Sequence, residues 1–440
     1  MRLRAMGALA CLCACAGMAM VSGAAAARVQ GPAPAGTIAP ADQLQVLHWW
    51  VSASERRAVD VLSGALLAQN IGWQDTVIPN GSGVGAGIVL RSRILARDAP
   101  QVAQLNGRVM AEWAHMDLLL NLDRVAAAGH WNQLLLPAIE ELAQSDGHFV
   151  AAPLGIHRVN TLFYNRRLFA RYGLAPPTTW AEFERAAVRL SRAGIVPLAQ
   201  SSEPWQVATL FETLVLSEGG AGLYRRLFID REGNAFADPR LGAALTHLRE
   251  LKKWMNSPVP ERSWYASTRE LADNRAAMLV MGDWAKGEMN AWGLVTDEAF
   301  GCTAVPGTAS FHLYNVDSLA MLSARVMSSS VPHQAAQEKL AALVMTPQVQ
   351  ADYSQAKGSV PVLRSPDMTR MDSCARASWK LFSSGGAAQV PSLVHRMAAD
   401  EIVRDGMVAV VHRFFLDDKV TVAETQRRLG AIARSPTNNR

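Results

Sequence analysis

Several short segments of this chain combine tryptophans with side chains that can bind hydroxyl groups. Trp49 and Trp50 end a hydrophobic, strand-like run, and Glu55 follows them closely. Asp283 and Trp284 follow a second strand-like run at residues 277–281. An indole offers a flat apolar face, and a carboxylate accepts hydrogen bonds. This combination suits a ligand such as a sugar, whose C–H faces stack on rings and whose buried hydroxyls each need a partner.

These residues also have purely structural interpretations. Consecutive strand residues face opposite sides, so one of Trp49 and Trp50 could pack in the core while the other covers a loop. Ser52-x-x-Glu55 has the form of a capping box, which alone explains a Glu there. Asp283 could be the N-cap of the next helix. We favour a ligand role for Asp283, because open α/β sheets place ligands at the carboxyl ends of their strands.

Three other candidates have less specific sequence signals. Lys357, in Lys357-Gly358-Ser359, could belong to an ordinary exposed loop, although only seven of the 43 basic residues are Lys. His395 lies between the apolar residues Leu393 and Met397, which is typical of a buried, hydrogen-bonded histidine. Trp264 and Trp205 could each serve in packing or in stacking.

The first part of the chain alternates strands and helices. Residues 44–50 form a predicted strand, and the apolar residues after Ser52 recur at helical spacing. A short strand at 76–78, a Gly-rich loop at 80–87, a helix at 88–96 and a strand at 101–105 follow. Strand–helix–strand alternation of this kind predicts a parallel α/β sheet.

The middle and last parts of the chain are predicted to be mostly helical. Strands are predicted at 149–153 and 160–164, and a helix begins with the capping box Thr179-x-x-Glu182. Gly194 ends that helix, and Pro197 prevents its continuation. The pattern then stays largely helical to about residue 300. After a strand at 318–322, the last 90 residues are predicted to be helical, with loops near 357–366 and 383–391.

The composition indicates a large globular protein. The chain has 440 residues, of which 50% are hydrophobic and 18% charged, enough for two to three domains. Its net charge of +5 argues against a dedicated nucleic-acid binder, which carries a concentrated basic stripe. The histidines and the Cys302 and Cys374 thiols lack zinc-site spacing, so no metal is expected.

The N-terminus is predicted to be a targeting segment. Residues 1–27 combine two Arg, an apolar run and a small-residue run suited to cleavage, which predicts a signal peptide. A membrane anchor and a lipoprotein cleavage site at Leu12-Cys13-Ala14-Cys15, where Cys at the second position is atypical, are the weaker alternatives. Residues 28–43 are rich in Pro, Ala and Gly and predict a flexible lead-in. After cleavage only Cys302 and Cys374 remain, and the sequence does not show whether they pair.

Several segments occur in the order found in one known family. They are His48-Trp49-Trp50 with Glu55, Gly81–Gly87 with Leu90-Arg91-Ser92-Arg93, Pro153-Leu154-Gly155-Ile156-His157-Arg158-x-Asn160, Pro177-Thr178-Thr179-Trp180-x-Glu182-Phe183, Met281-Gly282-Asp283-Trp284-Ala285, Lys357-Gly358-Ser359-Val360-Pro361 and Ser392-Leu393-Val394-His395. The set covers about residues 44 to 430. It resembles the family 1 extracellular solute-binding proteins of ABC sugar importers, close to their glucose/mannose-binding branch.

The resemblance implies a fold and a division of the chain. The implied fold is α/β, a two-lobed periplasmic-binding-protein fold of type II-like topology, with the lobes joined by a hinge. Crossings between lobes are expected near Pro153, Pro306 and Tyr353. Lobe 1 would then contain residues 44–153 and 306–352, and lobe 2 residues 154–305 and 353–440.

The resemblance also implies the site residues. The family places the Glu that matches Glu55 and the Lys that matches Lys357 against sugar oxygens, and it favours Trp264 as a ligand platform. The implied substrate-binding set is Trp49, Trp50, Glu55, Asn106, Trp264, Asp283, Lys357 and His395. Two departures stand out: Asn106 occupies a position where the sugar-binding branch often has Lys, and Val84 alters the Gly-rich loop. The first leaves the identity of the sugar open.

The implied function is capture of one monosaccharide, glucose or mannose, and its delivery to the permease subunits of an ABC importer. The protein would be a monomeric periplasmic binding protein, not an enzyme, with no cofactor and no nucleic-acid partner. One alternative is an exported glycoside hydrolase with Glu55 and Asp283 as its carboxylate pair. Another is a sugar-sensing protein for a membrane receptor. Gly81-x-Gly83-x-x-Ala86 formally fits a dinucleotide fingerprint, but its preceding strand is short and an exported protein has no nicotinamide pool.

Overall fold

The structure is a computed structural model that describes residues 39–79, 84–327 and 332–435. The predicted signal peptide, most of the lead-in and the first half of the Gly-rich loop lie outside these residues. Within the described ranges, no helix combines the length and the apolar run needed to cross a lipid bilayer.

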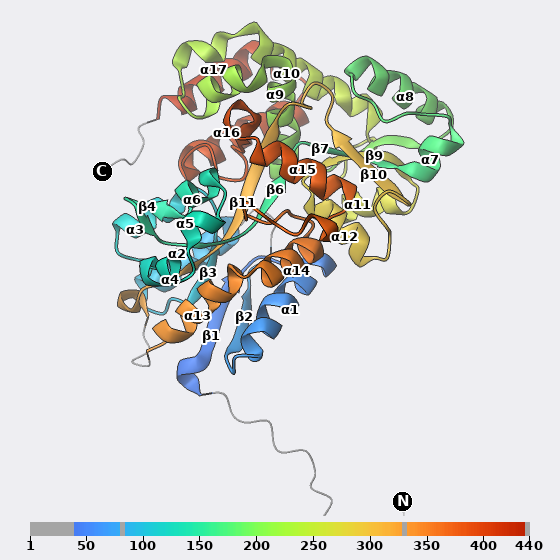
Figure 1. Cartoon of the computed structure of the whole chain (residues 1–440). Helices are drawn as coiled ribbons and strands as arrows, with labels where there is room; N and C mark the ends of the chain where they lie inside the picture. Colours follow the sequence, from blue (N-terminus) through green and yellow to red (C-terminus); the bar gives the residue numbers. More distant parts are fainter. Residues whose placement is uncertain (1–38, 80–83, 328–331, 436–440) are drawn as a thin grey trace, which may run out of the picture. The chain divides into compact units, whose positions relative to one another are not determined.

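The larger sheet collects strands from distant parts of the chain (Figure 1). It contains β1 (Gln43–His48), β2 (Gly72–Val77), β3 (Val102–Leu105), β6 (Ala152–Arg158), β11 (His312–Met321) and β12 (Gln389–Pro391). β1 pairs in parallel with β2 and β3, as the strand–helix alternation predicted. β11 is antiparallel to both β3 and β6. β11 begins well before the predicted strand at 318–322. The sequence did not predict its first half, because buried polar residues interrupt the hydrophobic pattern there.

The smaller sheet lies in the middle of the chain. Its strands are β10 (Phe300–Ala304), β7 (Thr161–Asn165), β9 (Ala276–Met281) and β8 (Val196–Ala199), in that order. The expectation of a mostly helical region missed β8 and β10. β8 contains Pro197 and lies at the edge of the sheet, which is where a strand tolerates proline. The chain passes from the larger to the smaller sheet through Val159 and Asn160, between β6 and β7.

Helices cover both sheets. Around the larger sheet these are α1 (Ala53–Leu67), α2 (Val84–Leu95), α3 (Val109–His115), α4 (Asp123–Ala128), α5 (Trp131–Leu134), α6 (Pro137–Leu142), α13 (Gln334–Val344) and α14 (Pro347–Lys357), with the small hairpin of β4 (Gln144–Ser145) and β5 (His148–Phe149). Alternate residues of β1 enter different clusters: Leu44 and Val46 lie in one apolar cluster and Leu47 in another. This sheet is therefore buried on both faces, as expected for parallel strands.

The remaining helices surround the smaller sheet or follow it. They are α7 (Arg166–Arg171), α8 (Trp180–Arg192), α9 (Pro204–Phe228), α10 (Pro239–Glu250), α11 (Trp264–Ala272), α12 (Trp284–Ala291), α15 (Ser373–Ser383), α16 (Glu401–Leu416) and α17 (Val422–Ala433). Short 3-10 helices are η1 (Pro40–Asp42), η2 (Gly233–Ala237), η3 (Leu251–Trp254), η4 (Ala324–Val326), η5 (Met368–Arg370) and η6 (Gly386–Ala388). The C-terminal α16 packs on α9, so the end of the chain returns to the middle region (Figure 1).

Both predicted capping boxes are present. Ser52 and Glu55 cap α1 reciprocally, and Thr179 and Glu182 do the same for α8. Gly194 follows α8 with a φ of 74°, a left-handed conformation that glycine adopts without strain. These helix starts were predictable because a capping box involves only residues close in sequence.

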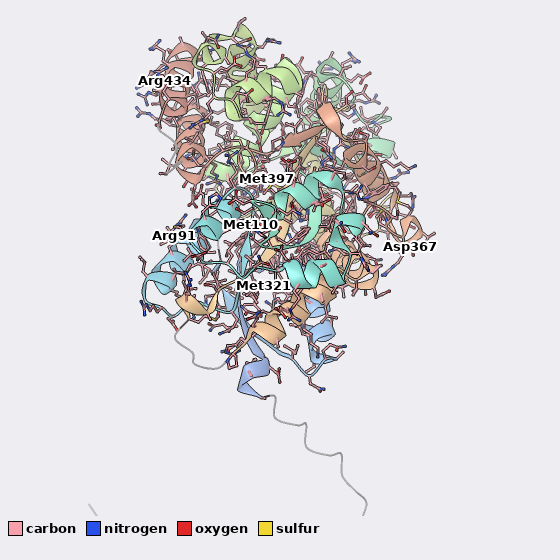
Figure 2. All side chains as sticks on the ribbon, turned by 60° about the vertical axis from the view of Figure 1, so that its left-hand side comes forward. Arg91, Met110, Met321, Asp367, Met397 and Arg434 are labelled. Carbon is pink, nitrogen blue, oxygen red and sulfur yellow. A yellow bond between two sulfur atoms is a disulfide. The ribbon has the colours of Figure 1, made fainter. Side chains whose placement is uncertain are left out.

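Cys302 and Cys374 form a disulfide with a Cα–Cα distance of 6.0 Å. It joins β10 to α15, across a sequence separation of 72 residues. Methionines fill parts of the interior: Met110 and Met321 are buried, whereas Arg91 and Arg434 are exposed (Figure 2).

Candidate functional site

A small polar cavity lies where the carboxyl ends of β1 and β3 meet the segment after β9 and the loop before α16. Its water-accessible volume is about 50 Å³, space for roughly four water molecules. The residues that line it are Trp49, Trp50, Glu55, Asn106, His157, Trp205, Trp264, Trp284, Asn315, Asp317, Lys357, His395 and Arg396. Every predicted site residue except Asp283 is in this set.

The two tryptophans after β1 both line the cavity, so neither of them serves only to pack the hydrophobic core. The Trp49 N–H donates to Gln104 Oε1 at 3.3 Å, and the Trp50 N–H donates to His48 Nδ1 at 3.2 Å. The Trp50 ring is fully buried and meets Tyr353 edge-on, with 6.2 Å between ring centroids. Among the described residues, the Trp50 indole N–H has no hydrogen-bond partner.

Glu55 is both a helix cap and a cavity residue, because its two oxygens have different partners. Oε2 accepts hydrogen bonds from the N–H groups of Val51 and Ser52, at 2.9 and 3.0 Å. Oε1 accepts from Lys357 Nζ at 3.3 Å. The capping box and the predicted site are therefore compatible.

Lys357 is a buried cation at the end of α14, and the exposed-loop alternative is wrong. Only 4% of its side chain is exposed, and Nζ lies 3.9 Å from Asp317 Oδ2. The next residue, Gly358, has a φ of 90°, and a Cβ there would lie 2.3 Å from the carbonyl oxygen of Asp283. Glycine is thus required for the chain to turn Lys357 into the site.

Asn106 follows β3 and is buried, not exposed to solvent. Its Nδ2 donates to Asp317 Oδ1 at 3.0 Å and to Asn315 Oδ1 at 3.3 Å. Within the described part of the chain, its Oδ1 has no hydrogen-bond partner. The register explains the contact: Leu105 pairs with Ser318 in the antiparallel β3–β11 pair, which brings Asn106 beside Asp317.

Asp283 stands behind the cavity wall. It occupies the N-cap position of α12, but its side chain makes no capping hydrogen bond, so the simple N-cap interpretation is wrong. Instead Oδ2 accepts from the Arg158 N–H at 3.0 Å, and Oδ1 accepts from His157 Nδ1. Any effect of Asp283 on a ligand therefore acts through His157.

His157 lies between two carboxylates. Its Nε2 is 3.3 Å from Asp317 Oδ2, on the side opposite Asp283. Burial disfavours the charged imidazolium, but the two carboxylates outweigh burial and raise the pKa of His157. Burial likewise opposes ionisation of Asp317, yet the hydrogen bond from His157 and the charge of Lys357 hold the pKa of Asp317 well below its usual value. His157, Asp317 and Lys357 form a buried ionic group on one wall.

His395 lies on the other wall, among indoles. Its ring centroid is 5.3 Å from that of Trp284 and 6.1 Å from that of Trp205. Its Nδ1 is 2.8 Å from Ser392 Oγ. Burial, with a contribution from the charge of Arg404, lowers the pKa of His395 to about 3, so the ring is neutral near pH 7.

The sequence analysis missed His157, Asn315, Asp317 and Arg396 and left Trp205 and Trp284 undecided. His157 was inside a matched segment, and Asn315 and Asp317 interrupt a mostly buried strand that also contains apolar residues. A polar residue within a buried strand is a signal for such a site, since it needs a partner.

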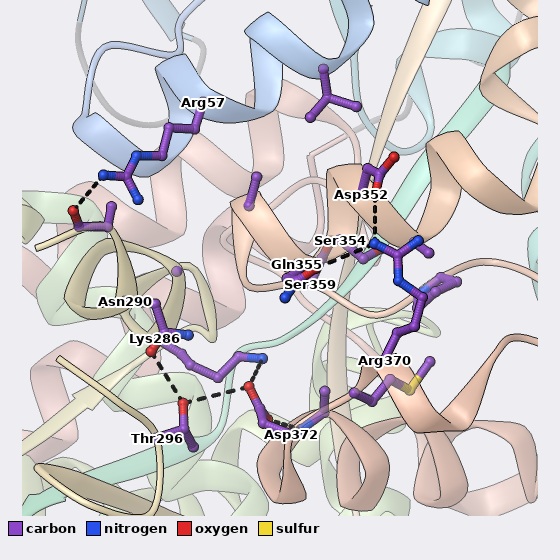
Figure 3. A pocket seen from close by; sticks show the side chains of 18 of the residues that line it. Arg57, Lys286, Asn290, Thr296, Asp352, Ser354, Gln355, Ser359, Arg370 and Asp372 are labelled. Atoms are coloured by element: carbon purple, nitrogen blue, oxygen red, sulfur yellow. Dashed lines mark hydrogen bonds and ion pairs between the residues drawn. The ribbon is translucent and has the colours of Figure 1, made fainter. Parts of the chain in front are cut away.

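A second, larger groove of about 640 Å³ lies along α12, α14 and the segment before α15 (Figure 3). Its charged groups bond to protein atoms: Lys286 Nζ to Asp372 Oδ2 at 2.8 Å, and Arg57 to the carbonyl oxygen of Ala291 at 2.8 Å. None of the described residues that line it is aromatic. It therefore lacks the stacking surfaces that the smaller cavity has.

Two lobes that each contain a sheet, with a polar cavity between strand ends, define a binding protein of the periplasmic type. The chain belongs to the bacterial extracellular solute-binding proteins, whose sequence pattern matches residues 90–368. It is 32% identical over 377 residues to a probable sugar-binding periplasmic protein of Rhizobium meliloti, covering 85% of this chain and 90% of that one.

Solved structures share the predicted two-lobed α/β fold, which is thus confirmed. The bacterial solute receptor AcbH, which prefers β-D-galactopyranose, has a TM-score of 0.74 at 16% identity over 89% of this chain and 97% of its own. The maltose-bound MalE3 of T. maritima has a TM-score of 0.74 at 18% identity, over 89% and 99% of the two chains. At such identities the similarity establishes the fold and leaves the ligand open.

Proposed function

We propose that this protein captures one monosaccharide, glucose or mannose, between its lobes and delivers it to the permease subunits of an ABC importer. The observation that carries the proposal is a cavity with tryptophan walls and buried polar atoms that lack protein partners. Among the described residues, the indole N–H groups of Trp50 and Trp284 and the Asn106 Oδ1 are such atoms. Each unpaired buried group costs about 1–3 kcal/mol, so a ligand with several hydroxyls would regain that energy.

The size of the cavity argues against an oligosaccharide. A volume of about 50 Å³ holds a few water molecules, whereas an oligosaccharide needs an extended groove. The related proteins bind different carbohydrates, so this choice depends on the cavity and on the sequence resemblance, not on them.

Binding without turnover agrees with the positions of the two carboxylates that a hydrolase would use. Both oxygens of Glu55 already accept hydrogen bonds from protein groups, namely two main-chain N–H groups and Lys357. Asp283 is separated from the cavity by His157. Neither carboxylate is placed to protonate a leaving group.

The proposed setting follows from the sequence and the relatives. We place lobe 1 around the larger sheet and lobe 2 around the smaller one, close to the implied bounds of 44–153 with 306–352 and of 154–305 with 353–440. The first crossing lies at Val159 and Asn160 instead of Pro153, because β6 pairs within the larger sheet, and β12 likewise belongs to the larger sheet. The mature protein would be a periplasmic monomer that lacks residues 1–27.

Calorimetry against a panel of hexoses and pentoses tests the proposal. We expect one site per chain with a Kd near micromolar, about −8 kcal/mol, for glucose or mannose. Incubation with aryl glycosides should release no product. An absence of heat and of any thermal shift across the panel would remove the proposed function, and sugar release would favour the hydrolase instead.

Trp50→Phe tests the proposed hydrogen bond from the unpaired indole. The variant keeps an aromatic ring but loses the N–H, so the Kd should rise about tenfold, the scale of one hydrogen bond. Trp379→Phe is the matched control, because the Trp379 indole donates to the carbonyl oxygen of Leu363 and does not line the cavity. An unchanged Kd for Trp50→Phe would show that this N–H does not meet the ligand.

A further inference from the structure

Glu212 lies in α9, behind the cavity wall, and is completely buried. Its Oε2 accepts hydrogen bonds from the Tyr224 hydroxyl at 2.7 Å and from the main-chain N–H of Leu393 at 2.8 Å. Its Oε1 is 2.7 Å from Ser392 Oγ. Glu212 does not line the cavity. However, Ser392 connects Glu212 through two hydrogen bonds to His395, which does line the cavity.

The direction of each hydrogen bond in this chain follows from counting protons. An ionised Glu212 can only accept, so Ser392 donates its single proton to Oε1. The Ser392 oxygen is then an acceptor, and it receives the main-chain N–H of His395 at 3.2 Å. It must also receive the proton of His395 Nδ1 at 2.8 Å. A neutral imidazole has only one N–H, so its Nε2 carries a lone pair.

We propose that Glu212 is a positioning residue that acts through Ser392 to hold His395 in its Nδ1–H tautomer, so that Nε2 accepts a hydrogen bond from a ligand hydroxyl. The proposal rests on the proposed function for the identity of the ligand. Within the described residues, His395 Nε2 has no hydrogen-bond partner, whereas Nδ1 is already bonded to Ser392. The low pKa of His395 supports the neutral ring that this tautomer requires.

The tautomer of His395 matters for specificity because a hydrogen-bond donor lies next to it in the cavity. The indole N–H of Trp284, whose ring lies 5.3 Å from His395, is a donor without a partner among the described residues. A hydroxyl can accept from an indole and donate to an imidazole at the same time. The pair would therefore select a hydroxyl over a group that only accepts.

Glu212→Gln reverses the chain of hydrogen bonds. The N–H of Leu393 belongs to the main chain and cannot become an acceptor, so the amide oxygen of Gln must face it. The NH2 group then faces Ser392 and donates to Oγ. Ser392 must redirect its own proton to His395 Nδ1, which moves the imidazole proton to Nε2. The variant is nearly isosteric and changes a ligand-facing acceptor into a donor.

The first readout needs no ligand. Histidine labelled with ¹⁵N, measured by long-range NMR at pH 8, distinguishes the two tautomers, and loss of one signal in His395→Gln assigns the residue. Burial raises the pKa of Glu212 to about 7, so the carboxylate is largely ionised at this pH. We expect the Nδ1–H form in the wild type and the Nε2–H form in Glu212→Gln. An Nδ1–H signal in both would overturn the proposal.

Tyr224→Phe is the matched control. It also removes one hydrogen bond to Glu212, but on the side away from Ser392, so the tautomer of His395 should stay Nδ1–H. If Glu212→Gln does not fold, Ser392→Val decides the question. It removes the hydroxyl that links Glu212 to His395, and its methyl groups occupy the 3.9 Å between Glu212 Oε1 and His395 Nδ1. A wholly Nδ1–H ring in Ser392→Val would overturn the proposal, and a tautomer mixture would support it.

The second readout uses deoxyfluoro derivatives of the best-binding hexose in calorimetry. Fluorine accepts weakly and cannot donate, so fluorination at the position that meets His395 should weaken wild-type binding about tenfold. The same substitution should cost Glu212→Gln clearly less, since its Nε2–H can face the fluorine. Equal penalties at every position in the two proteins would overturn the proposal. A wild type that binds no hexose would refute the proposed function, while the NMR result would still decide the role of Glu212.

Discussion

Two histidines line one cavity, yet their surroundings give them opposite protonation. His157 lies on β6 of the larger sheet, between Asp283 and Asp317, and these carboxylates raise its pKa. His395 lies in the loop before α16. Among the described residues, its ring hydrogen-bonds to the neutral Ser392 hydroxyl, and burial lowers the pKa of His395 to about 3. Both rings are buried, so burial alone does not separate them.

The difference comes from the charge of the partners. An imidazolium with a carboxylate on each nitrogen recovers the solvation that it loses on burial, whereas an imidazole against a hydroxyl and indole rings does not. One wall of the cavity therefore carries a compact ionic group, and the other carries neutral aromatic and hydroxyl groups. A sugar would meet fixed charges on the first wall and stacking surfaces on the second.

We expect the largest effect from removing the charge of Asp283, which supports the buried ionic group of His157, Asp317 and Lys357. Asp283→Asn leaves His157 with one carboxylate and should lower the free energy of unfolding by roughly 3 kcal/mol, the usual cost of breaking a buried ion pair. Sugar affinity should fall as well, because Asp283 orients His157. Chemical denaturation and calorimetry on the same preparation measure both quantities.

Asp418→Asn serves as its control, since Asp418 is a surface residue paired with Lys252. That variant should leave both the unfolding midpoint and the Kd almost unchanged. If Asp283→Asn behaved like the control, the buried pair would have no role in stability or in binding.

The pH dependence of stability should differ in sign between the two histidines. Folding raises the pKa of His157, so its stabilising contribution is complete below pH 6.5 and is lost as the pH rises through its folded pKa. The folded pKa of His395 is depressed to about 3, so the unfolded chain binds more protons between about pH 6.5 and 3. Stability should therefore fall there on acidification, by at most about 1.4 kcal/mol per pH unit.

Denaturation from pH 4 to pH 9 on two variants separates these contributions. His395→Gln should flatten the curve below pH 6.5, and His157→Gln should flatten it above. Identical curves for the two variants would contradict the assigned difference between the walls.

The smallest expected effect concerns Asn106, which adds a neutral amide to the ionic wall. Asn106→Lys would place a cation beside Asp317 and remove the unpaired Oδ1. We expect the preference for glucose over mannose and galactose to increase by about 1 kcal/mol, the scale of one charge-assisted bond. The ratio of the three Kd values measures this change.

Asn106→Ala controls for loss of the amide without gain of a cation. A similar shift in both variants would assign the effect to the missing amide. An unchanged ranking of the three sugars in Asn106→Lys would show that this position does not control selectivity.

Local features of the fold were accessible from the sequence. The capping boxes at Ser52 and Thr179 were predicted correctly, because each involves residues only three apart. The first strand, predicted at 44–50, is present at Gln43–His48. The helix that ends before Gly194 was also predictable, since periodicity and glycine placement act over a few residues. The ordered matched segments led to the family and to most residues that line the cavity.

The partners of those residues were decided by the tertiary structure. Glu55 and Lys357 are 302 residues apart, and Asp283 and His157 are 126 apart, so no local pattern relates them. The sequence suggested Asp283 as a cavity residue, but its hydrogen bonds with His157 and with the Arg158 N–H, at the end of β6, place His157 in front of it. The sequence likewise identified Cys302 and Cys374 as the two cysteines left after cleavage but did not show whether they pair. Their disulfide becomes evident only from the folded chain, in which β10 lies next to α15.

The sequence by itself therefore determined which side chains were available and where several of the helices and strands begin or end. The tertiary structure alone decided which side chain pairs with which, and hence their charge. The physical reason is that helix caps and periodicity depend on bonds between near neighbours, whereas the protonation of a buried group depends on all the charges and dipoles around it. For His157 and His395 those surroundings come from strands and loops that meet only in the folded chain.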